Sequence, residues 1–397
     1  MDPTTPWQPA DWVNRGGELL AHDPRQAQRL IGHGLRGIPQ EPVAWFNLGI
    51  ALHQQRRIEA AIRAYRQALA LPGAPQAAIR NNLSQDLLLN GCFAEGWQLY
   101  EHRLQTARHD NRYFEQLDGP AWQGFEDPRP CRRLVLVAEQ GFGDTLQFCR
   151  LALHLQQQGI TTLLFCQPAL VPLLQESTAL GEVCSSAPAT LFDSTTRWCP
   201  LLSLPQRLGL TSATIPLAQG YLQPEPQRVL HWQRILQRRP GSRLIALHWQ
   251  GNPKHEGSLY SRGRSMDLRH WQPLANVAGV ELVSIQKGAG SEQLDNPGAL
   301  PLVTGQAEVS ASLDFRDTAA VLANCDLLIS ADSGVVHLAG AMGLPTWVAL
   351  RWIPEWRWLL TGENTAWYES VRLFRQPHEG DWASVVQAMC RALAEAF

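Results

Sequence analysis

Behind residue 130 the sequence alternates short apolar runs with helical stretches, and this alternation strongly limits the folds open to the chain. The apolar runs are RRLVLVA (132–138), TTLLFC (161–166), SRLIALHW (242–249), VELVSIQ (280–286), CDLLIS (325–330) and PTWVAL (345–350). Short buried strands separated by helices are typical of parallel sheets with crossover connections. The pattern fades near residues 220–227 and then restarts. We therefore predict two Rossmann-like α/β domains, over residues 131–230 and 231–397, with a cleft between them.

The first 110 residues carry a different pattern, a helical repeat. Small residues recur at one position and large apolar residues at another, in steps of 34 and then 35 residues: Ala27, Ala61 and Gly96, then Ile31, Tyr65 and Tyr100. This spacing resembles the tetratricopeptide repeat, a pair of antiparallel helices. We predict such repeats over residues 1–110. They form either a groove for a protein or peptide, or a structural cap or dimer surface.

Composition, charge and the N-terminal sequence limit the possible domain boundaries, partners and cellular locations of the protein. Residues 111–130 are interpreted as a linker because their second half is rich in Gly, Pro and Asp. The net charge of -2 gives no overall field that attracts nucleic acid. The N-terminus lacks a secretory pattern, and the most apolar stretch (333–350) fits a buried βαβ unit better than a membrane span.

The 8 cysteines contain no Cys-x-x-Cys pair. We therefore expect reduced thiols and no zinc site. Taken together, these properties predict a protein in the cytoplasm or peripheral to the inner membrane, with no nucleic-acid partner and no integral membrane span. The oligomeric state is left open.

Polar residues open the apolar segment SADSGVVHLAGAMGLPTWVAL (330–350). Asp332 and Ser333 follow a strand, and either is placed to cap the helix that begins at Gly334. A helix start carries unpaired N–H groups and partial positive charge, which suit a phosphate. His337 lies one turn into this helix, where it is either a core residue or a ligand-binding group. We predict a phosphate site at this helix start.

A loop rich in cations follows the strand that ends at His248. Ser265 is expected to cap a helix that starts at about Met266, and the candidate binding residues before it are Trp249, Gly251, Asn252, Lys254 and Arg264. Glycines and cations after a strand can neutralise a diphosphate leaving group, and the alternative is a solvated basic loop. Gln286 and Lys287 also follow a strand end, as either surface residues or further ligand-binding residues.

The turn AEQGFGDTLQF (138–148) links the first strand of the α/β region to a helix. Gly141 and Gly143 allow close backbone approach, although the spacing is not the G-x-G-x-x-G dinucleotide fingerprint. Asp144 either caps its helix or acts as a general base that activates an acceptor hydroxyl. The other residues expected on the acceptor side of the cleft are Glu139, Gln140 and Gln147.

Four of these segments together resemble a known family. EQGFGDTLQFCRL, HWQGNPKHEGSLYSRGRSMDL, SIQKG and DSGVVHLAGAMGLPTWVAL are similar to segments of glycosyltransferase family 9, the heptosyltransferase group. The whole chain is similar to bacterial proteins in which tetratricopeptide repeats precede such a domain. The resemblance implies a GT-B fold and a metal-independent, inverting transfer from a nucleotide-diphosphate sugar, with no other cofactor. The sequence contains no D-x-D motif, which fits a metal-independent enzyme.

The resemblance also implies roles for individual residues. Asp144 matches the proposed general base, and Asp332 matches a residue that contacts the donor. The donor phosphates and sugar would be lined by Ser333, Gly334 and His337. The basic loop is longer than in the family, so Lys254 and Arg264 compete as the cation that binds phosphate.

Residues 349–376 depart from the family pattern because they are rich in tryptophan. Trp352, Trp356 and Trp358 either stack on a sugar or nucleotide base or form a packing corner. We expect transfer to a hydroxyl of a protein or surface glycan. The alternatives are an inactive binding scaffold and a sugar-nucleotide epimerase, which would need additional carboxylates in the cleft.

Overall fold

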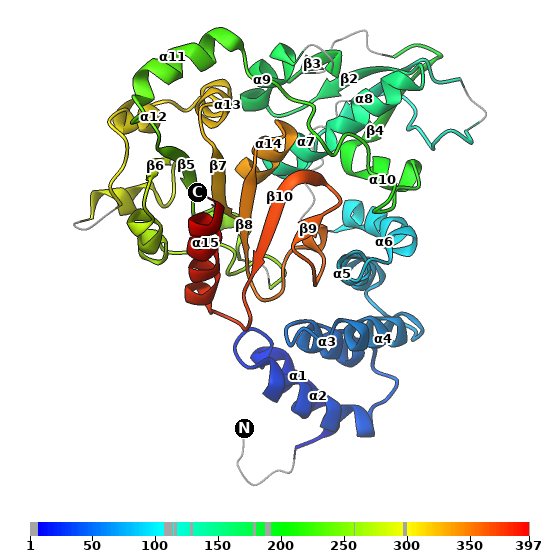
Figure 1. Cartoon of the computed structure of the whole chain (residues 1–397). Coiled ribbons are helices and arrows are strands. Elements are labelled where there is room, and N and C mark those ends of the chain that lie inside the picture. The colour runs from blue at the N-terminus through cyan, green and yellow to red at the C-terminus, as the bar shows by residue number, and fades with distance from the viewer. Residues whose placement is uncertain are drawn as a thin grey trace. The chain divides into compact units, whose positions relative to one another are not determined.

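The structure is a computed structural model. It describes residues 7–106, 114, 117–127, 130–177, 180–186, 192–257, 259–296 and 300–396. The chain divides into two compact units, and most helices and strands of both are labelled in Figure 1. One unit consists of Met1–His109 with Ile353–Thr361, and the other of Asp110–Trp352 with Gly362–Phe397.

The helices of the first unit pack in successive pairs. These are α1 (Pro9–Leu19) with α2 (Pro24–Gly37), α3 (Pro42–His53) with α4 (Ile58–Leu69), and α5 (Gln76–Leu89) with α6 (Phe93–Tyr100). Small residues are needed where paired helices touch. A Cβ atom at Gly49 would lie 2.2 Å from Cε1 of Tyr65, and one at Gly96 would lie 2.7 Å from Cδ2 of Leu88. The predicted repeats are confirmed.

A segment from late in the sequence, Ile353–Thr361, completes this unit. We call it the tryptophan strap. The ring of Trp356 lies edge-on to that of Trp97, with 5.1 Å between their centroids. Nη2 of Arg56 donates to the carbonyl oxygen of Leu360 at 2.6 Å. Because Trp356 and Trp358 are buried in this packing, the structure favours the packing corner over ligand stacking for both.

The second unit contains two α/β sheets. The first has the order β3-β2-β1-β4, and all its strand pairs are parallel. Its strands are β1 (Arg133–Val137), β2 (Thr161–Phe165), β3 (Glu182–Cys184) and β4 (Thr196–Pro200). The helix predicted after the turn AEQGFGDTLQF is divided at Cys149 into α7 (Phe142–Phe148) and α8 (Arg150–Gln157). The helices α9 (Val171–Glu176) and α10 (Leu204–Arg207) follow.

The segment interpreted as a linker reaches the edge of this first sheet. The backbone N–H of Trp122 donates to the carbonyl oxygen of Trp198 at 2.8 Å, and Ala121 forms a parallel bridge to the same residue. The side chain of Trp122 is buried. Residues 120–122 therefore extend the sheet beside β4.

The second sheet has the order β6-β5-β7-β8-β10-β9, and its pairs are parallel except for β10 with β9. Its strands are β5 (Arg243–His248), β6 (Val280–Ser284), β7 (Leu327–Ala331), β8 (Thr346–Leu350), β9 (Asn364–Thr365) and β10 (Tyr368–Arg375). The helices that accompany it are α11 (Pro226–Leu236), α12 (Gln306–Ala311), α13 (Phe315–Ala323), α14 (Gly334–Ala341) and α15 (Trp382–Ala396). Helical repeats with two parallel α/β sheets confirm the predicted fold class.

One predicted helix start is wrong. The helix expected at about Met266 is a 3-10 helix, η7 (Leu268–Asn276), and its N-cap is Asp267, which accepts from the N–H of Arg269 at 3.0 Å. Ser265 does not cap it, because its hydroxyl donates to Glu256. Among the described residues, no helix combines the length and the apolar character that a bilayer crossing requires.

Candidate functional site

The turn after β1 holds the predicted base. Asp144 is half-buried in the first turn of α7, and its Oδ2 accepts from the backbone N–H of Gly141 at 2.9 Å. This is the capping contact expected of a carboxylate at the third helical position. Gln140, just before the helix, has a left-handed φ of 62°. Asp144 therefore caps its helix, and the same bond orients its carboxylate at the end of β1.

Gln167 braces this turn from the end of β2. Its Oε1 accepts from the hydroxyl of Thr145 at 2.8 Å, and its Nε2 donates to the carbonyl oxygen of Gln140 at 3.3 Å. Glu139 is buried and accepts from the N–H of Leu202 at 3.2 Å. Gln147 is also buried. Glu139 and Gln147 therefore lie in the interior beside the turn.

The turn after β7 holds the predicted phosphate site. Ser333 occupies the N-cap position of α14, but its side chain makes no capping bond. Its Oγ lies 3.1 Å from Nδ1 of His248 and 3.1 Å from Oγ of Ser330. Asp332 is only 8% exposed and forms no hydrogen bond or ion pair with the residues that the structure describes. The N–H groups at the start of α14 are therefore not capped by either side chain.

The two turns meet through glycines. A Cβ atom at Gly143 would lie 2.8 Å from Cδ2 of His337 and 3.2 Å from Cα of Gly334. Any side chain at Gly143 would therefore push α7 and α14 apart. This close approach brings Asp144 of the first sheet's turn beside the helix start that carries Ser333.

His248 ends β5 and faces this helix start. Burial, with a smaller contribution from Arg264, lowers its pKa from 6.5 to about 4. The imidazole is therefore neutral at physiological pH. In this form it hydrogen-bonds Ser333 without adding charge to the site.

The pKa of His248 predicts a pH dependence of stability. Between pH 6.5 and about 4 the unfolded chain binds a proton at His248 that the folded chain does not, so the free energy of unfolding falls as the pH is lowered through this window. The full loss is about 3 kcal/mol. Urea unfolding from pH 7 to pH 4 should show this slope, and His248→Asn should flatten it. The exposed His22→Asn should keep it; an unchanged slope in His248→Asn would assign the loss to other groups.

Gln286 organises the loop after β5. Its Oε1 accepts from the N–H groups of Trp249 and Gln250, at 3.1 and 3.0 Å, and its Nε2 donates to the carbonyl oxygens of Gln250 and Ala289. Trp249 is completely buried, and its indole N–H donates to Gly290. Gln286 is thus neither a surface residue nor a group aimed at a ligand, and both residues support the loop.

The two competing cations differ in their surroundings. Lys254 is exposed, and within the part of the chain that the structure describes its one hydrogen bond runs from its backbone N–H to Oδ1 of the exposed Asn252. Arg264 is half-buried, with Nε 3.5 Å from Oε1 of Glu256. A Cβ atom at Gly251 would lie 3.2 Å from Nη2 of Arg264. The Arg264 side chain is therefore held by its surroundings, whereas the Lys254 side chain is exposed.

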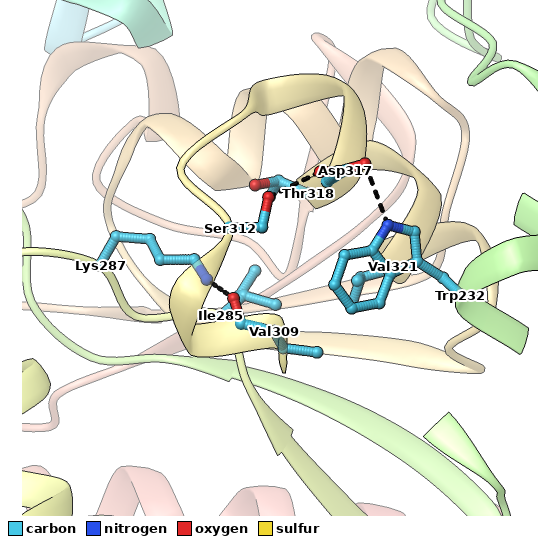
Figure 2. A pocket seen from close by; sticks show the side chains of 8 residues that line it. All are labelled: Trp232, Ile285, Lys287, Val309, Ser312, Asp317, Thr318 and Val321. Atoms are coloured by element: carbon cyan, nitrogen blue, oxygen red, sulfur yellow. Dashed lines mark hydrogen bonds between the residues drawn. The ribbon is translucent and has the colours of Figure 1, made fainter. Parts of the chain in front are cut away.

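Lys287 is directed toward a small pocket beside α12 and α13 (Figure 2). Its Nζ donates to the carbonyl oxygen of Val309, and burial lowers its pKa to about 8. On the other side of the pocket, Asp317 accepts from Ser312 at 2.7 Å and from the indole of Trp232 at 3.1 Å. The pocket's lining residues are Trp232, Ile285, Lys287, Val309, Ser312, Asp317, Thr318 and Val321.

Sequence reasoning missed His248 and Gln167 as site residues. His248 stands at the carboxyl end of a strand, which is the signal that could have found it. Gln167 has no local signal, because its partners Gln140 and Thr145 precede it by more than 20 residues. The predicted residues that the structure brings together at the two turns are Gly141, Gly143, Asp144, Asp332, Ser333, Gly334 and His337.

Comparison with known families agrees with this architecture. Residues 42–71 match the tetratricopeptide repeat model. Residues 270–350, which include α14, match the model described as glycosyltransferase family 9 (heptosyltransferase). The chain therefore contains one segment similar to the tetratricopeptide repeat and another similar to glycosyltransferase family 9.

Individual proteins match this chain at low sequence identity. The chain is 29% identical over 382 residues to Protein FlbA of Caulobacter vibrioides, a match that covers 91% of this chain but only 63% of FlbA. Two solved structures resemble part of the chain, both with a TM-score of 0.43. A glycosyl transferase family 9 protein from Veillonella parvula is 12% identical and covers 67% of this chain and 98% of its own. The E. coli ADP-heptose lps heptosyltransferase II is 13% identical and covers 66% and 99%.

Proposed function

We propose that the chain is a metal-independent, inverting glycosyltransferase that moves a sugar from a nucleotide-diphosphate sugar to a hydroxyl of a protein or surface glycan. The observation that supports this most is the close approach of Gly143 to Gly334 and His337. Ligands of parallel α/β sheets bind beyond the carboxyl ends of the strands. Here one such end carries a carboxylate, and the other carries an uncapped helix start.

The donor's diphosphate is proposed to bind at the start of α14. Backbone N–H groups there attract phosphate oxygens, and Arg264 supplies positive charge as the nucleotide diphosphate departs. Asp332 has the wrong charge for phosphate. Its buried carboxylate suits the hydroxyl groups of a sugar, which donate hydrogen bonds to it.

The reaction is a single displacement at the anomeric carbon. Asp144 takes the proton of the acceptor hydroxyl while that oxygen forms the new glycosidic bond. The bond to the diphosphate oxygen breaks at the same time, and the nucleotide diphosphate leaves with the electron pair. Attack from the face opposite the leaving group inverts the anomeric centre. The repeats are proposed to select a protein acceptor.

The test is a thermal-shift panel of ADP, GDP, UDP, CDP and their sugar conjugates, with the full chain and with EDTA present. A nucleotide at 100 times its dissociation constant adds about 2.7 kcal/mol to the free energy of unfolding. A shift with one nucleotide in EDTA supports the proposal. Absence of any shift favours the binding scaffold, and a shift that appears only with added Mg²⁺ or Mn²⁺ contradicts metal independence.

Asp332→Asn should weaken donor binding and leave the stability of the ligand-free protein almost unchanged. The oxygen atoms of Asp332 are not among the enclosed, unpartnered polar atoms of the described residues, so the ligand-free variant should stay within about 0.5 kcal/mol of the wild type. Donor affinity should fall about tenfold or more, because hydrogen bonds to the charged group are lost. Thermal melting and calorimetric titration measure the two effects.

The control for this experiment is Asp326→Asn. Asp326 pairs with Arg238 and Arg243, so its replacement should destabilise the protein and leave donor affinity unchanged. Equal donor affinity in Asp332→Asn and the wild type would remove Asp332 from the binding site.

A further inference from the structure

Arg150, the first residue of α8, carries a completely buried guanidinium group. Among the described residues it has no carboxylate partner. Its donors reach the carbonyl oxygens of Gln147 at 2.9 Å and Trp367 at 2.6 Å, and the hydroxyl of Tyr221 at 3.2 Å. A buried cation is costly unless its donors are satisfied. The oxygen atoms around Arg150 accept these hydrogen bonds and thereby allow the guanidinium to be buried.

Two tyrosine rings enclose this guanidinium. Its Cζ lies 4.7 Å from the ring centroid of Tyr221 and 4.5 Å from that of Tyr368. Tyr221 belongs to the segment between the two sheets, and Tyr368 begins β10 of the second sheet. Attraction between the cation and the ring faces therefore ties α8 of the first sheet to a strand of the second.

Tyr368 connects this cluster to the candidate site. Its hydroxyl lies 3.0 Å from Nδ1 of His337, one turn into α14. A Cβ atom at Gly340 would lie 2.6 Å from the Tyr368 ring, so the glycine lets the helix rest directly on it. The ring therefore contacts both Arg150 and α14.

The hydroxyl of Tyr368 can act as a donor to His337. Burial raises the pKa of Tyr368 to about 12, so the group keeps its proton at neutral pH. When Nδ1 of the imidazole accepts this proton's hydrogen bond, the neutral ring carries its own proton on Nε2. The opposite edge of the His337 ring lies against Gly143 at the meeting of the two turns.

We propose that Tyr368, held in place by Arg150, is a positioning residue that fixes the Nε2-protonated tautomer and the orientation of His337 for donor binding. This inference rests on the proposed function. A neutral imidazole with its N–H directed at the site donates a hydrogen bond to a donor oxygen atom. An imidazole that carries its proton on Nδ1 would present a lone pair to the same oxygen and repel it.

The tautomer can be measured directly with the full chain labelled with ¹⁵N-histidine. The His337 signals are assigned by their loss in His337→Gln. We expect the wild type to show a protonated Nε2 and an unprotonated Nδ1, and Tyr368→Phe to show a mixture of both tautomers. Tyr65→Phe is the matched control, because Tyr65 is a buried tyrosine of the repeats, packed against Gly49 and outside the Arg150 cluster. It should leave the tautomer unchanged.

Binding of ADP, GDP and UDP provides the second measurement. Tyr368→Phe should bind the preferred nucleotide about five- to tenfold more weakly, as expected for one lost hydrogen-bond contribution. In a His337→Gln background the same substitution should cause no further loss. Additive losses, or an unchanged tautomer in Tyr368→Phe, would overturn the inference.

The two proposals fail in different ways. If the wild type binds none of the nucleotides, the proposed function fails while the tautomer experiment still decides the role of Tyr368. A wild-type His337 with its proton on Nδ1 overturns the inference without any variant, even if Tyr368→Phe does not fold.

Discussion

Replacing Asp144 with asparagine is expected to abolish sugar transfer and to leave donor binding intact. The amide cannot take the acceptor's proton, and loss of a general base lowers the rate about 10²–10⁴-fold. The amide oxygen of asparagine can still accept from the N–H of Gly141, so the start of α7 should be preserved. Initial rates at saturating donor and acceptor measure the first effect, and calorimetric titration of the donor measures the second.

The matched control is Asp267→Asn, which changes a capping aspartate at the start of η7. It should retain transfer. Full activity in Asp144→Asn would mean that Asp144 is only a helix cap and that another group takes the proton. Loss of donor binding together with transfer would instead indicate that the turn after β1 had rearranged.

Truncation of Trp356 is expected to destabilise the unit that contains the repeats. Trp356 is buried, and it packs edge-on against Trp97 and Tyr100. Trp→Ala substitutions in packed cores cost about 3–5 kcal/mol, because they remove apolar contacts and leave a cavity. Urea unfolding followed by far-ultraviolet circular dichroism, which reports the helices, should show the loss.

Trp7→Ala serves as the comparison, because Trp7 is 44% exposed and should contribute far less. Trp356→Phe should fall between the two, since it keeps an aromatic ring of smaller volume. A loss below about 1 kcal/mol in Trp356→Ala would be typical of a surface position. It would show that the tryptophan strap is not part of the core of this unit.

The glycines show which contacts a local sequence pattern can predict and which it cannot. The sequence predicts that Ala61 and Gly96 lie where helices touch, because small residues recur at the repeat spacing. It also predicts that Gly143 permits a close approach. The partner of Gly143 is His337, almost 200 residues later, and no local pattern names it. Contacts between distant segments depend on how the sheets pack.

Asp144 and Gln286 show two different limits of predicting a side chain's role from the sequence. Both alternatives for Asp144, cap and base, were open from the sequence, and the structure adds the capping bond to Gly141. Gln286 follows a strand in an ordinary-looking loop, yet it is buried and holds the backbone of Trp249 and Gln250. A side-chain amide can satisfy either water or buried backbone groups, and only the surrounding chain decides which.

The amino-acid sequence by itself determined the repeats, the α/β alternation and the polar turns at strand ends, because each depends on residues close together in the chain. Only the tertiary structure decided that Arg150 is buried between Tyr221 and Tyr368, and that Trp356 packs on Trp97. The physical reason is that these side chains gain their partners only when distant segments pack together. The side chains of arginine and tryptophan can be either exposed or buried, because each has an apolar and a polar part. The residues that pack against them and accept their hydrogen bonds come from distant parts of the chain.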